Sequence, residues 1–151
     1  MRYAIVVVTL LLAVSPARAA WEAAADIQPR VEHHIREVRA LIAHFETFVA
    51  DPCPHFSTPG EWNAYADGEI DRMLLLAAHA EQAWVEAKRT GDDAVRQTAK
   101  APRRRLDEAP QILTKLSSCA HDNGVDLSPE SVYRRIERAL PQRQSEIALP
   151  R

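Results

Sequence analysis

The chain has 151 residues, with 19 lysines and arginines against 21 aspartates and glutamates, and a formal net charge of −2. This length suits one domain and is too short to expect two. A mildly acidic chain of mixed charge is not the basic surface that nucleic acids require, so we expect no nucleic-acid partner. Only four glycines, together with many alanines, favour helix.

Residues 1–19 have the three parts of a removable export signal. Arg2 is positively charged, residues 4–14 form an uncharged apolar run, and Ala17 and Ala19 fit the A-x-A pattern of signal peptidase sites. The run is about half as long as the roughly 20 residues that cross a bilayer, which favours a cleaved signal over an anchor. We therefore expect cleavage after Ala19 or Ala20. The mature chain, residues 20–151, would be periplasmic or secreted, with no transmembrane segment.

The first two predicted helices cover residues 26–50 and 59–90. Asp26 is the expected N-cap of the first helix, and Thr58 with Glu61 forms a capping box at the start of the second. Apolar residues of the first helix recur at steps of four and three, which places them on one face. They are Val31, Ile35, Val38, Ile42, Phe45 and Val49. Both segments are thus predicted to be amphipathic helices.

The third predicted helix covers residues 92–120 and contains two prolines, Pro102 and Pro110. Its apolar spacing of four and three continues across both prolines. We therefore predict one helix that is kinked at the prolines, with two shorter helices broken near Pro102 as the alternative.

The fourth predicted helix covers residues 129–140, with Ser128 as its N-cap and Val132, Ile136 and Leu140 as its buried edge. Pro141 is expected to end or bend it, and a loosely docked tail is expected from about residue 141. Four amphipathic helices with short connections predict an all-α, single-domain bundle that is mostly up-and-down.

The two cysteines, Cys53 and Cys119, follow the first helix and close the third. In an up-down-up arrangement both positions lie at the same end of the bundle. Because an exported chain meets an oxidising compartment, we predict a disulfide between them.

A metal site is the alternative at that end of the bundle. Each cysteine is followed two positions later by a histidine, His55 or His121. Two thiolates and two imidazoles, from Cys53, His55, Cys119 and His121, would complete a tetrahedral zinc or copper site. The C-x-H spacing is unusual for structural zinc sites, and the compartment favours oxidation, so the disulfide is preferred.

Three further histidines, His33, His44 and His79, fall off the apolar stripes. We expect them to be solvated surface residues, which could sense acid pH only if the fold clusters them. A haem site would need axial ligands such as Met73 with a histidine, but Met73 lies on the core stripe, where packing is the commoner role.

Arginines form two clusters, whose members include Arg103, Arg104, Arg105, Arg134, Arg135 and Arg138. Charge runs are usually solvated helix faces, here with nearby acids such as Asp107, Glu108, Glu130 and Glu137. The functional interpretation is a surface for an anionic partner, because arginine binds carboxylates and phosphates bidentately.

No catalytic motif occurs in the chain, and no cofactor is expected. The sequence is therefore interpreted as an exported, non-enzymatic helical protein that binds another macromolecule, either a protein or a component of the cell envelope. Candidate roles are a periplasmic accessory factor, a chaperone-like protein, or an inhibitor or immunity-type protein. The alternative is a metal- or haem-binding four-helix protein that uses the cysteine end or the bundle core.

Overall fold

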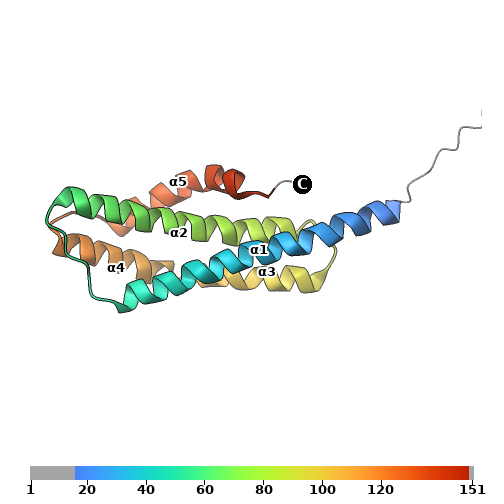
Figure 1. The fold of residues 1–151 in the computed structure, drawn as a ribbon, viewed down its shortest axis with the longest axis horizontal. Helices are drawn as coiled ribbons and strands as arrows, with labels where there is room; N and C mark the ends of the chain where they lie inside the picture. The colour runs from blue at the N-terminus through green and yellow to red at the C-terminus, as the bar shows by residue number, and fades with distance from the viewer. Residues whose placement is uncertain (1–15, 150–151) are drawn as a thin grey trace, which may run out of the picture.

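The structure is a computed structural model that describes residues 16–149. Within this range it is all-helical, and it confirms the predicted four-helix bundle. The helices are α1 (Pro16–Ala50), α2 (Pro59–Ala87), α3 (Asp93–Arg105), the 3₁₀ helix η1 (Leu106–Glu108), α4 (Ala109–Asp122) and α5 (Pro129–Ile147). Figure 1 shows that α3, η1 and α4 form one arm, so that the four arms run alternately in opposite directions.

Helix α1 begins at Pro16, ten residues before the predicted start at residue 26. The preceding segment is rich in alanine, the strongest helix former, and continues the helix. Asp26 is therefore not an N-cap; its carboxylate instead accepts hydrogen bonds from the Arg30 side chain, the shorter at 2.7 Å. The predicted cleavage point lies in the first turns of α1, while residues 1–15 of the predicted export signal lie outside the described residues.

The third arm is broken at η1, not near Pro102. Pro102 lies inside α3, whereas η1 ends two residues before Pro110. Pro110 lacks an N–H, and its ring would clash with the carbonyl of Leu106 in a continuous α-helix. The tighter 3₁₀ turn begins at that residue, so Pro110 divides the arm into two helices.

The predicted end of the fourth helix at Pro141 is wrong. Helix α5 continues through this proline to Ile147. The residues predicted as a loosely docked tail are held against the bundle: Arg143 forms an ion pair with Asp71 of α2. The Arg30 guanidinium of α1 donates a hydrogen bond to the Leu149 carbonyl at 3.0 Å. These two contacts connect the last part of the described chain to α2 and α1.

The interior consists of two hydrophobic clusters along the bundle. The larger one contains Trp62, Leu116 and most of the apolar stripe of α2, and it is covered by Phe45 and Phe48 of α1. The smaller one is built around Val31 and small residues such as Ala83. Val49, which was predicted to lie on the apolar face of the first helix, is 36% exposed, and Phe48 is buried in its place. A stripe with a strict 3.5-residue repeat drifts around a 3.6-residue helix, which accounts for this shift.

A disulfide joins Cys53 and Cys119, as the positions of the cysteines predicted, with the Cα atoms 5.2 Å apart. Asn123 ties the same two segments together. Its side-chain amide donates to the carbonyls of Pro54 and Cys119, and its side-chain oxygen accepts from the Phe56 N–H. The loop after α1 is thereby fixed to the end of α4.

Replacing both cysteines (Cys53→Ala with Cys119→Ala) should lower the free energy of unfolding by about 4 kcal/mol, because the bond joins two residues that are 66 positions apart in the unfolded chain. Urea unfolding of the two proteins measures the difference. Reducing the wild type should reproduce the loss, while the double variant should not respond to reductant. Equal midpoints for the two proteins would contradict this role of the disulfide.

Candidate metal centre

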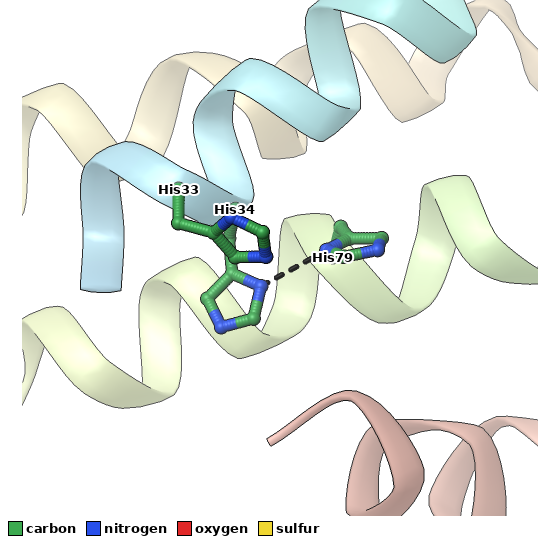
Figure 2. A group of neighbouring side chains, drawn as sticks. All are labelled: His33, His34 and His79. Carbon is green, nitrogen blue, oxygen red and sulfur yellow. Dashed lines mark hydrogen bonds between the residues drawn. The ribbon is translucent and has the colours of Figure 1, made fainter. Parts of the chain in front are cut away.

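Three histidines from two helices converge in the bundle. His33 and His34 lie next to each other on α1, and His79 lies on α2 (Figure 2). Each ring offers one nitrogen, and these three nitrogens lie within 4.8 Å of one another. It is the one group of three or more histidine, cysteine or acidic side chains with metal-ligand spacing among the described residues.

The core faces of α1 and α2 bring the rings together. His34 follows Val31 by three positions and precedes Val38 by four, so it shares their buried face. His79 has the same relation to Leu76 and Ala83 on α2. Since these flanking residues belong alternately to the smaller and the larger hydrophobic cluster, the histidines lie at the boundary between the two clusters.

The two buried rings are hydrogen-bonded to each other. His34 is fully buried and His79 is 8% exposed, and their Nδ1 atoms are 2.9 Å apart. The other ring nitrogen of His34, Nε2, is buried and has no hydrogen-bond partner. A bare buried nitrogen is less costly than an unpaired N–H group. This favours the tautomer in which the His34 Nδ1–H donates to Nδ1 of His79.

Burial keeps both rings neutral near pH 7. Desolvation, and then the neighbouring His79 and His33, lower the pKa of His34 from 6.5 to about 4. The pKa of His79 is also lowered, mainly by burial, although Glu37 acts in the opposite direction. Neutral imidazole is the form that binds metal ions. The half-buried His33 is the member of the group nearest to solvent.

The prediction that His79 is a solvated surface residue is therefore wrong, and His34 was missed as a candidate. The remaining histidines lie apart from this group. His44 bonds the buried carboxylate of Glu69 at 2.7 Å, and His55 and His121 are exposed. Met73, considered as a haem ligand, is buried in the larger hydrophobic cluster.

The alternative metal site at the cysteine end is incompatible with the disulfide. Its sulfurs, those of Cys53 and Cys119, are bonded to each other, so neither is a thiolate that could bind zinc or copper. His55 and His121 alone provide only two of the four ligands that the site needed.

Three of the six arginines in these clusters pair with acids of the same chain. Arg103 pairs with Glu81 at 2.8 Å and lies over the Trp84 ring, and Arg135 pairs with Asp67 at 2.6 Å. Arg134 lies 3.6 Å from Glu130, and Arg138 donates to the Arg134 carbonyl. Most of these acids belong to α2 and not to the sequence neighbours expected to pair. The surface for an anionic partner, which also included Arg104 and Arg105, stays a prediction.

The buried histidines should make the protein less stable in acid. Between its folded pKa of about 4 and its unfolded pKa of 6.5, His34 takes up a proton mainly in the unfolded state. The contribution of the neutral His34 ring to the free energy of unfolding is therefore fully present above about pH 6.5, and it falls as the pH decreases below that value. We expect a loss of about 2 kcal/mol between pH 7.5 and pH 5, measured by urea unfolding. The His34→Leu variant should lose clearly less free energy of unfolding over this pH range. An equal loss in the variant and the wild type would show that His34 is not responsible.

Comparisons with known proteins do not assign the chain to a family. No protein-family model, curated protein or solved structure matches it. Among the described residues, no helix is both long enough and apolar enough to cross a membrane. The chemistry of the histidine group is therefore the specific evidence on function.

Proposed function

We propose that this protein is an exported metal-binding helical bundle, in which His33, His34 and His79 hold one divalent transition-metal ion. The observation that carries the proposal is the convergence of three imidazoles from two helices within 4.8 Å. Imidazole ligands suit zinc, copper and nickel in their divalent states. Three protein ligands also leave a fourth tetrahedral position open for water or another exchangeable ligand.

The geometry is close to what coordination requires. Two nitrogens that share one tetrahedral zinc ion lie about 3.3 Å apart, because each Zn–N bond is about 2.0–2.1 Å long. The Nδ1 atoms of His34 and His79 are 2.9 Å apart, which is close to this spacing. An ion would replace the proton between them, and each ring would turn from the other nitrogen towards the ion. The His33 ring needs a somewhat larger adjustment and lies on a half-exposed side chain that can make it.

One other feature supports a cation at this position. Glu37 acts electrostatically on His79, and its negative charge would favour a cation bound there. Export is supported by the signal-like segment of residues 1–19 and by the disulfide.

Binding of another macromolecule, the role first expected from the sequence, has weaker support. Its main argument was an arginine-rich surface, and four of those arginines have partners inside the chain. The metal-binding alternative gains a specific site, although this site lies in the bundle interior and not at the cysteine end.

Calorimetric titration of the mature protein with Zn²⁺ tests the proposal, and one ion should bind per chain. His79→Ala should weaken binding at least about 100-fold, because loss of a direct ligand exceeds the 10–100-fold effect of losing a supporting residue. Zn²⁺ at 100 times its dissociation constant should also stabilise the wild type by about 2.7 kcal/mol.

His121→Ala is the matched control, since this histidine is exposed and outside the group. It should leave the affinity and the stoichiometry unchanged. Circular dichroism confirms that each variant is folded. Undiminished binding by folded His79→Ala, or the absence of zinc, copper and nickel binding by the wild type, would contradict the proposal.

A further inference from the structure

A groove that is separate from the proposed metal centre lies on another side of helix α2. It lies between α2, the junction of η1 with α4, and α5, and its volume is about 390 Å³. Met73 and Leu76 of α2, Ile112 of α4, and Ile136 and Leu140 of α5 contribute to its apolar lining. Pockets of about 300–1,000 Å³ with mostly apolar walls are the usual form of small-molecule sites.

The groove exists because helix α5 is incompletely covered. Val132, Ile136 and Leu140 were predicted to form a buried edge, but only Val132 is buried. Ile136 and Leu140 are half-buried, and the Tyr133 ring beside them is 57% exposed. The break of the third arm before Pro110 places the short η1 turn opposite this edge, where a straight helix would have continued.

The rim of the groove is negatively charged. Asp107, Glu81 and Glu137 all line it, and the charge of Glu81 is matched by its ion pair with Arg103. Asp107 and Glu137 have no ion-pair partner among the described residues, and both are exposed. Tyr133 precedes Glu137 by one helical turn and lies on the same face. An aromatic ring beside carboxylates is the chemistry that attracts organic cations.

We infer that this groove binds a small amphiphile that carries one ammonium group. Its apolar body would occupy the space lined by Met73 and Ile136, and its ammonium group would lie between Asp107 and Glu137 at the face of Tyr133. The charge of the rim argues against an anionic amphiphile, because the described residues that line the groove include three carboxylates and no lysine or arginine. Arg134 and Arg138 line a neighbouring hollow together with Glu137, but they are engaged by Glu130 and by the Arg134 carbonyl. This inference is independent of the metal centre, which lies between α1 and α2.

The methyl group of Met73 reports directly on the groove. Met73 is one of two methionines, and the other, Met1, belongs to the segment that we expect to be removed. The mature protein, labelled with ¹³C at the methionine methyl groups, is titrated with octyltrimethylammonium and separately with octyl sulfate, both below their micelle concentrations. The ammonium compound should shift the Met73 signal saturably, and octyl sulfate should bind at least about tenfold more weakly.

Two groove variants sharpen the test. Asp107→Asn combined with Glu137→Gln should weaken binding of the ammonium compound about tenfold, and Ala77→Leu should abolish it by filling the groove. Asp122→Asn with Asp126→Asn removes the same charge outside the groove and should have no effect. Equal binding of both amphiphiles, an unshifted Met73 signal, or insensitivity to the two groove variants would each overturn the inference.

Discussion

The hydrogen bond between the buried rings of His34 and His79 is the constraint on which the account of function depends. Imidazole nitrogens can be buried between two helices only if they are neutral and at least partly paired. The bond meets part of this requirement for His79 and leaves Nε2 of His34 without a partner. The polar centre therefore lies between two well-packed hydrophobic clusters but is not itself fully satisfied. The two hydrogen-bonded Nδ1 atoms are the pair that the proposed ion would bind.

The rest of the bundle holds the two helices in this register. At one end, the disulfide and the Asn123 side chain fix the loop that joins α1 to α2. At the other, the Arg30 side chain connects α1 to the chain terminus through the Leu149 carbonyl. Helix α2 packs against α1, α3 and α5, so its position determines where His79 lies. A metal-ligand group built on rigid helices keeps its geometry better than one built on loops.

Periodicity and capping residues predicted the helical class, the number of arms and most of the buried positions. The capping box at Thr58 and the cap at Ser128 were correct because they depend on local backbone chemistry. The start of α1, the break at η1 and the end of α5 were not predicted correctly. Alanine propensity outweighed the N-cap signal of Asp26 at the start of α1. The tertiary contacts of Arg143 outweighed the stop signal of Pro141 in α5. The disulfide was predictable because topology alone brings both cysteines to one end. The histidine group was not, although His34 and His79 each occupy a core-face position, because their relative height depends on the register between α1 and α2.

The most direct test of the central claim is nitrogen NMR of the six histidines during a Zn²⁺ titration of ¹⁵N-labelled mature protein. Without metal, His34 and His79 should show neutral rings at pH 7. With one equivalent of Zn²⁺, ring nitrogens of His33, His34 and His79 should move to metal-bound values together, while those of His44, His55 and His121 stay in place. Unchanged signals from His34 and His79, or shifts confined to the exposed histidines, would contradict the account.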